Sequence, residues 1–309
     1  MIRPKGWRSL AAAAVLMVLA AVPTAARAAD KVQVVATQSL LADLVRQIGK
    51  ERVEVRHVAS PRFNVHYIQP RPSDVRALRK ADLYVNAGLD LEAWSDPLVE
   101  AAGRPEFFRG AARSVDVSTQ VKLLKVPQTG PSRAEGDIHL YGNPHYTLDP
   151  RNARPMCEVI LAKLKEIDPE GASVYDANHQ AFLAKLDAKL AEWQVLCAHC
   201  SGKEVLSYHD DFEYMADYLD LKAERFLEPK PGVPPTPRHL QELEEYARSG
   251  AVKAIVMPTY FPKGIAESFG RRIGVPVVTV AQNVGEVAEN EDYFAFFDRN
   301  LQVLAEALK

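Results

Sequence analysis

Residues 172–197 read ASVYDANHQAFLAKLDAKLAEWQVLC, and this stretch divides the chain into two halves. Phe182, Leu186, Leu190, Trp193 and Cys197 recur in it at intervals of 4, 4, 3 and 4 residues. That spacing places apolar side chains on one face of an α-helix. Because the stretch contains neither Gly nor Pro, it predicts a single long amphipathic helix.

Short apolar runs rich in β-branched residues occur on both sides of this helix, and helical patterns follow them. The expected strands cover 32–36, 53–58, 83–87, 204–208, 222–227, 252–257 and 275–280. The expected helices cover 40–48, 73–80, 212–219, 237–249, 265–273 and 293–308. Alternation of strands and helices predicts parallel sheets. We therefore expect two Rossmann-like α/β lobes, residues 29–171 and 198–309, joined by one backbone helix at 172–197.

The first 28 residues have the three parts of a secretory signal peptide. Arg3, Lys5 and Arg8 precede an apolar run at 10–22, and Ala-Arg-Ala at 26–28 offers small residues for cleavage before Ala29. The run is too short to span a bilayer comfortably, although an N-terminal membrane anchor is the alternative. No cysteine lies near the cut, so a lipid anchor is not indicated. We expect a cleaved leader and a periplasmic protein.

Composition and charge exclude several classes of protein. Of the 309 residues, 47% are hydrophobic and 25% are charged, as in ordinary globular proteins. The leader holds four basic residues and no acid, so the rest carries 34 basic and 40 acidic residues, a net charge of −6. That balance lacks the excess of basic residues that is typical of proteins that bind nucleic acid. The sequence also lacks the His-Glu-x-x-His, Walker A and G-x-S-x-G signatures of common enzymes.

Three histidines share a setting that is typical of binding sites in α/β proteins. His66, His145 and His209 each follow an expected strand or lie in a turn-rich loop. Ligands of open α/β sheets bind beyond the carboxyl ends of strands, and two facing lobes would bring such ends together at a cleft. Neutral imidazole binds Zn²⁺ and similar cations. The spacings of 79 and 64 residues match no local zinc signature, and a single loop histidine more often makes an ordinary hydrogen bond.

The segments around these histidines resemble the motifs of a known family. The first is HYIQPRPSD at 66–74, followed by NAGLDLEAW at 86–94; the second is NPHYTLDP at 143–150; the third is YHDDFEY at 208–214. In order and spacing they are similar to blocks of the TroA-like solute-binding proteins, which serve ABC importers of zinc and manganese. The resemblance covers about residues 31–309, and the long central helix fits that family's backbone helix.

The resemblance implies a metal site in the cleft between the lobes. His66 and His145 would come from the N-terminal lobe and His209 from the C-terminal lobe, and together they would hold one divalent cation. The family often has a carboxylate ligand after the last strand, where this chain reads TVAQNVG at 279–285. We therefore expect Glu228 as the fourth ligand, with water, Asp211 or Gln282 as alternatives.

The ligand set favours one metal over others. Three histidines without a carboxylate would favour Zn²⁺, whereas carboxylate-rich sites suit Mn²⁺; Mn²⁺ or another divalent transition metal remains an alternative. Residues 127–144 form a long Gly- and Pro-containing loop, but they hold only His139 and no histidine tract. His139 is an auxiliary ligand candidate.

The resemblance also implies partners and a function. We expect a monomeric, non-enzymatic periplasmic protein that delivers the cation to an ABC permease and its ATPase, with no role for nucleic acid. One alternative is a secreted metal-dependent hydrolase that recruits Asp210, Asp211 or Glu228 as a general base. The other is a metal-binding adhesin on the same fold.

Two of the three cysteines form a C-x-x-C motif. Cys197 and Cys200 flank Ala198 and His199 at the end of the predicted long helix. In an oxidising compartment the first expectation is a local disulfide. A redox catalyst is disfavoured because such motifs usually begin a helix, and a second metal site is a further alternative. Cys157 is expected to be a buried thiol.

Overall fold

The computed structural model describes Met1 and residues 31–127, 141–230 and 232–309. The expected leader apart from Met1, most of the expected loop at 127–144, and His139 therefore lie outside the described residues. Residues 31–309 form one compact unit, to which the following description applies. None of the helices described is long and apolar enough to cross a membrane.

The N-terminal half contains a parallel sheet in the order β2-β1-β3-β4. Its strands are β1 (Val32–Ala36), β2 (Val53–His57), β3 (Leu83–Asn86) and β4 (Ser114–Asp116). The helices of this half are α1 (Ser39–Gly49), α2 (Pro72–Arg79), α3 (Ser95–Ala102) and α4 (Ala153–Ile167). All three strand pairs are parallel, because each strand returns through a crossover connection.

The C-terminal half repeats the same topology with the order β6-β5-β7-β8. Its strands are β5 (Glu204–Ser207), β6 (Lys222–Phe226), β7 (Val252–Pro258) and β8 (Val277–Val280). The helices are α6 (Glu213–Leu219), α7 (Pro237–Ala247), α8 (Lys263–Ile273) and α9 (Tyr293–Ala307). In both sheets the order reverses beside the first strand, so each lobe has a switch point where ligands of such folds bind.

The predicted fold of two α/β lobes with parallel sheets and one long helix is confirmed, although α3, α4 and β4 were not predicted. Every expected strand is present within one or two residues. Strand β4 was not predicted, because Ser114–Asp116 is only three residues long and two of the three are polar. The predicted strand at 275–280 begins at Val277, after Pro276, whose carbonyl accepts a hydrogen bond from Ile255 N.

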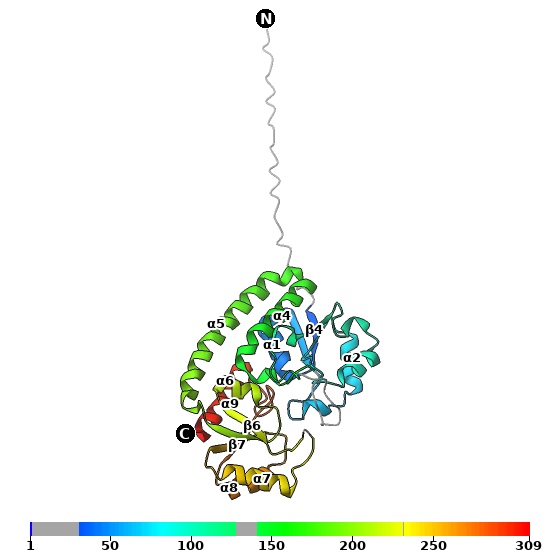
Figure 1. The fold of residues 1–309 in the computed structure, drawn as a ribbon. Helices are drawn as coiled ribbons and strands as arrows, with labels where there is room; N and C mark the ends of the chain where they lie inside the picture. The colour runs from blue at the N-terminus through cyan, green and yellow to red at the C-terminus, as the bar shows by residue number, and fades with distance from the viewer. Residues whose placement is uncertain (2–30, 128–140, 231) are drawn as a thin grey trace. The chain divides into compact units, whose positions relative to one another are not determined.

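Helix α5 (Ala172–Cys197) packs against both halves of the chain. It contacts α1 and α4 at one end and α9 at the other, and Figure 1 shows it running past these helices. Of the predicted apolar face, Phe182, Leu186, Trp193 and Cys197 are buried, and Leu190 is half-buried. The Trp193 ring lies 5.5 Å from that of Phe297, and its Nε1 donates to Asp298 Oδ1 at 2.7 Å. One helix face therefore fixes α9 alongside α5.

Helix α9 also ties the C-terminal half back to the N-terminal half. At its first turn, Tyr293 N donates to Asp43 Oδ2 on α1 at 2.9 Å. The Tyr293 hydroxyl donates to the Pro150 carbonyl at 3.2 Å, and both contacts are buried. Breaking either bond would leave a buried polar group unpaired, which costs about 1–3 kcal/mol of stability.

A buried carboxyl group, Glu92, joins the carboxyl ends of β1 and β3. It accepts hydrogen bonds from Thr37 Oγ1 at 2.6 Å, Gln38 Nε2 at 2.7 Å and Ala87 N at 3.1 Å. Burial raises the pKa of Glu92 to about 7, although these hydrogen bonds oppose the shift. The folded protein thus retains a proton that the unfolded chain loses above its usual glutamate pKa of 4.5.

Replacing Leu186 on α5 tests how much the central helix contributes to stability. Leu186 is fully buried, so Leu186→Ala should lower the free energy of unfolding by about 2–5 kcal/mol. Val195 lies on the same helix but is 79% exposed, so Val195→Ala should change it by about 0.5 kcal/mol or less. Urea unfolding measures both. Equal effects would contradict the packing of α5 described above.

The Glu92→Gln variant tests the buried carboxyl group. Because the folded state binds the extra proton, wild-type stability should fall as the pH rises from 4.5 to about 7. The variant should lack this part of the slope, which is at most about 1.4 kcal/mol per pH unit for one proton. The exposed Glu100→Gln on α3 is the control. Denaturant unfolding across this pH range gives the comparison, and parallel wild-type and Glu92→Gln curves would refute the shift.

Candidate metal centre

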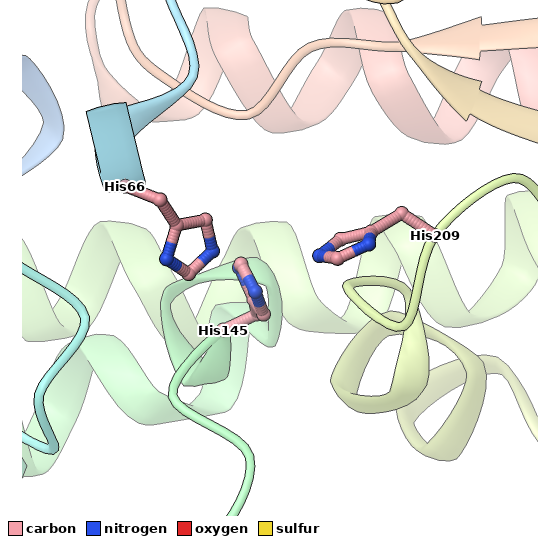
Figure 2. A group of neighbouring side chains, drawn as sticks. All are labelled: His66, His145 and His209. Atoms are coloured by element: carbon pink, nitrogen blue, oxygen red, sulfur yellow. The ribbon is translucent and has the colours of Figure 1, made fainter. Parts of the chain in front are cut away.

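Three histidine side chains that lie far apart in the sequence meet between the two halves. One ligand atom of each of His66, His145 and His209 lies within 4.8 Å of the others. The ring centroids are 5.3 Å apart for His66 and His145, 5.9 Å for His145 and His209, and 6.1 Å for His66 and His209. Figure 2 shows the three rings pointing toward one another from three separate segments. Within the described residues, no other such group is found.

His66 lies in a short helix, η2 (Val65–Tyr67), that follows the carboxyl end of β2. The Asn64 side chain caps this turn, because its Oδ1 accepts a hydrogen bond from His66 N at 3.0 Å. The buried Trp94 donates from Nε1 to the Val65 carbonyl at 2.7 Å. The two contacts fix the peptide unit between Val65 and His66, which leads into the residue that carries the imidazole.

His145 is positioned by Asn143, two residues earlier. Asn143 Oδ1 accepts a hydrogen bond from His145 N at 3.0 Å, and Asn143 Nδ2 donates to the Asp210 carbonyl at 3.0 Å. The Tyr214 hydroxyl, on α6, donates to the Asn143 carbonyl at 2.9 Å. One asparagine therefore connects the segment that carries His145 to the residue that follows His209.

His209 follows β5, and its imidazole is held by a carboxylate. Nδ1 lies 2.8 Å from Glu228 Oε2, and both side chains are buried. Burial lowers the pKa of His209, but the hydrogen bond to Glu228 and the nearby negative charges raise it by more, so the net shift is upward. With Nδ1 on the carboxylate, Nε2 is the nitrogen that remains for the centre of the group.

Glu228, Asp211 and Gln282, the residues expected to supply a fourth ligand, are all buried but have different contacts. Glu228 is not part of the three-histidine group and contacts the outer nitrogen of His209 instead. Asp211 is 1% exposed, its Oδ2 has no hydrogen-bond partner among the residues described, and burial raises its pKa to about 7. Gln282 is also buried, in the segment that follows β8.

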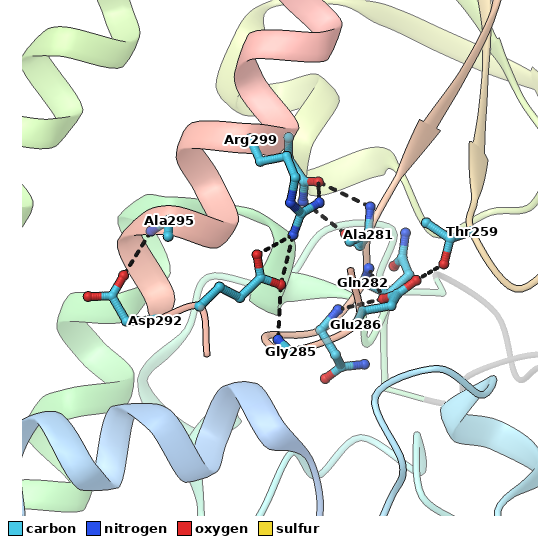
Figure 3. Close-up of polar contacts among 11 residues, drawn as sticks. Thr259, Ala281, Gln282, Gly285, Glu286, Asp292, Ala295 and Arg299 are labelled. Atoms are coloured by element: carbon cyan, nitrogen blue, oxygen red, sulfur yellow. Dashed lines mark hydrogen bonds and ion pairs between the residues drawn. The ribbon is translucent and has the colours of Figure 1, made fainter. Parts of the chain in front are cut away.

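A buried glutamate that the sequence reasoning missed organises the segment after β8. Glu286 Oε2 accepts hydrogen bonds from Gln282 N at 2.7 Å and Asn283 N at 3.0 Å, and Glu286 Oε1 accepts one from the Thr259 hydroxyl (Figure 3). Burial raises the pKa of Glu286 to about 7. Only its sequence position, four residues after Gln282, could have suggested this role, because nothing in the sequence pairs it with Thr259.

A second acid in the same segment supports the first. Glu291 accepts two hydrogen bonds from Arg299 at 2.6 and 2.8 Å and one from Gly285 N at 2.9 Å (Figure 3). Gly285 has a φ of +82°, a backbone conformation that favours glycine. The segment after β8 is therefore fixed by carboxylates that accept backbone hydrogen bonds.

The predicted cysteine pair lies outside this group. Cys197 and Cys200 are both buried thiols in the structure, as is Cys157, so the expected disulfide between Cys197 and Cys200 is not formed in it. His139 lies outside the described residues.

The chemistry of the group fits a divalent cation. Imidazole nitrogens are common ligands of Zn²⁺, Cu²⁺, Ni²⁺ and Fe²⁺. A ligating histidine almost always donates its other ring N–H to a carboxylate or carbonyl, which is the arrangement of His209 and Glu228. A structural hydrogen-bond cluster would not require three rings from three elements to point at one centre.

Comparison with known proteins also points to metal binding. The family model described as "Zinc-uptake complex component A periplasmic" (ZnuA) matches residues 34–307. The chain is 24% identical over 286 residues to the high-affinity zinc uptake system protein ZnuA of Bacillus subtilis, covering 90% of this chain and 88% of that protein. It is also 24% identical over 291 residues to the manganese ABC transporter substrate-binding lipoprotein PsaA of Streptococcus pneumoniae, covering 90% and 89%.

The fold is shared with solved structures as well. A crystal structure of ZnuA superposes with a TM-score of 0.75 at 21% identity, covering 91% of this chain and all of that chain. Proteins of this family are the substrate-binding components of metal ABC transporters, which work outside the cytoplasm with a membrane permease and an ATPase. The resemblance inferred from the histidine motifs is thereby confirmed, and the chain belongs to the ZnuA family of periplasmic metal-binding proteins.

Proposed function

We propose that this protein captures one Zn²⁺ ion with His66, His145 and His209 and delivers it to an ABC permease. The observation that carries the proposal is the convergence of three imidazole nitrogens within 4.8 Å. In a tetrahedral zinc site with Zn–N bonds of about 2.0–2.1 Å, ligand nitrogens lie roughly 3.3 Å apart. The nitrogens would therefore have to approach one another by at most about 1.5 Å around the ion.

Zinc is the proposed cargo because of the ligand types. The group contains three imidazoles and no carboxylate, and imidazole suits Zn²⁺ whereas carboxylate oxygen suits Mn²⁺. The relatives do not decide the matter, since one is named for zinc and another for manganese. The donor set of this chain is therefore the argument for zinc.

Glu228 is proposed as a positioning residue rather than the fourth ligand. Its Oε2 is 2.8 Å from the outer nitrogen of His209 and also accepts a hydrogen bond from Gly232 N at 3.4 Å. This contact orients the ring and fixes its tautomer, so that Nε2 presents its lone pair to the metal. A water molecule then completes the coordination of the ion.

Delivery requires no covalent chemistry by this chain. The protein binds the cation between the lobes, and docking on the permease releases it. We further propose that the leader at 1–28 is cleaved, because Ala-Arg-Ala at 26–28 offers small residues for cleavage before Ala29. The protein then acts as a monomer in the periplasm.

Metal titration of histidine variants tests the ligand assignment. His66→Ala, His145→Ala and His209→Ala should each weaken Zn²⁺ affinity by more than about 100-fold, the upper end of the loss seen for outer-shell partners. His57→Ala is the matched control, because His57 ends β2 but lies outside the group. Calorimetric titration of the chelator-stripped protein gives the affinities. Wild-type affinity in all three variants would refute the site, and tighter binding of Mn²⁺ than of Zn²⁺ would refute the choice of metal.

The Glu228→Gln variant separates a positioning role from a ligand role. Loss of the carboxylate behind His209 should weaken Zn²⁺ binding by about 10- to 100-fold. The exposed Glu224→Gln on β6 is the control and should leave the affinity unchanged. A loss as large as that of the histidine variants would identify Glu228 as a ligand, and no loss would remove it from the site.

A further inference from the structure

Two buried cysteines lie three residues apart where the long helix ends. Cys197 is the last residue of α5, and Cys200 ends the short helix η9 (Ala198–Cys200) that leads toward β5. Their exposed fractions are 5% and 0%. Residues three apart in a helical stretch are neighbours on its surface, so the two side chains lie on the same side of this turn. A local adjustment of this turn can therefore bring the two sulfur atoms together without rearrangement of the fold.

The surroundings hold this pair against α9. Cys197 Sγ lies 3.8 Å from the Leu301 carbonyl, and Cys200 Sγ lies 3.8 Å from His199 Nε2. His199 Nε2 is in turn 2.8 Å from the Ala305 carbonyl. The neighbouring side chain of Cys197 lowers the pKa of Cys200 to about 7, which suits Cys200 to the resolving step of a disulfide exchange. The thiolate is the reactive form in disulfide exchange.

A pocket gives access to one of the two sulfur-bearing residues. Its volume is about 680 Å³, which is in the range of small-molecule sites. Cys197 lines it together with Leu190, Ala191 and Gln194 of α5, and Tyr218 and Asp220 line the opposite side. The Tyr218 hydroxyl is buried and has no hydrogen-bond partner among the described residues. A small disulfide can therefore approach Cys197 without unfolding of the chain.

We propose that Cys197 and Cys200 form a thiol–disulfide exchange site, which low-molecular-weight disulfides reach through this pocket. Cys197 gives its proton to water and attacks the disulfide RSSR, which forms a mixed disulfide and expels one RS⁻ that takes up a proton. Cys200 then gives up its proton and attacks Cys197 Sγ, which forms the Cys197–Cys200 bond and expels the second RS⁻. The two thiols of the protein are oxidised, RSSR is reduced, and the two protons end on two RSH molecules.

The exchange adds a covalent bond where α5 leads into the C-terminal lobe. The new bond closes a loop of only four residues, so its effect on the unfolded chain is small compared with that of a long-range disulfide. It removes two soft metal ligands from a zinc-handling protein and leaves the three histidines untouched. The site is independent of the proposed zinc centre, and its test does not depend on metal binding.

Thiol counting after exposure to a defined oxidant tests the proposal. The full chain is expressed with its leader, purified, reduced, freed of reductant and then incubated folded with glutathione disulfide. It is alkylated in denaturant with or without a second reduction, and the mass is measured. One alkylated cysteine, Cys157, is expected without that reduction and three with it. Three alkylated cysteines in both samples would overturn the proposal.

Variants separate the pair from its pocket and from the third cysteine. Cys157→Ala should still form the disulfide, whereas Cys197→Ser and Cys200→Ser should not form an internal one. Ala191→Trp narrows the pocket from an exposed position on α5 and should slow oxidation of the folded protein several-fold, with no effect once the chain is unfolded in urea. Peptide mapping that finds Cys157 in the disulfide would refute the pairing, and an unchanged rate in Ala191→Trp would refute the route.

Discussion

The amide of Asn143 is the contact on which the arrangement of the histidines depends. Its oxygen accepts the backbone N–H of His145, and its nitrogen donates to the carbonyl of Asp210, the neighbour of His209. The two segments belong to different lobes, so this side chain sets their register directly. An amide can do so because it offers both a donor and an acceptor, whereas an aspartate or a leucine offers at most one. The distance between two of the three imidazoles follows from this bridge.

Much of the fold could be predicted because its signals are local. Short apolar runs typical of strands alternate with the spacing typical of helices. The long helix α5 could be recognised from the spacing of apolar residues between Phe182 and Cys197. Strand β4 could not be recognised, because its three residues are partly polar and are held by pairing with β3. The identical strand order of the two sheets could not be predicted from the sequence either, since tertiary packing decides which parallel strands pair.

The candidate site was predictable to a lesser extent. The motifs around His66, His145 and His209 identified the residues that the structure brings together, although their spacing alone matched no known zinc signature. The motifs did not show that Glu228 faces the outer nitrogen of His209, because a carboxylate near a histidine can bind either the metal or the ring. Glu286 was missed for a similar reason, since its partners Thr259 and Gln282 meet only after β7 and β8 pair.

The contacts between the lobes differ in strength from the interior to the rim. In the interior, Tyr293 N bonds to Asp43 and the Tyr214 hydroxyl bonds to Asn143, and both contacts are buried. At the rim, Arg62 and Glu289 are joined by a 3.4 Å ion pair whose side chains are 59% and 82% exposed. Exposed pairs contribute about 0–1 kcal/mol, whereas leaving a buried group unpaired costs about 1–3 kcal/mol. A wide hinge opening would break the costly contacts, so movement that admits or releases a cation is easier at the rim segments than about α5.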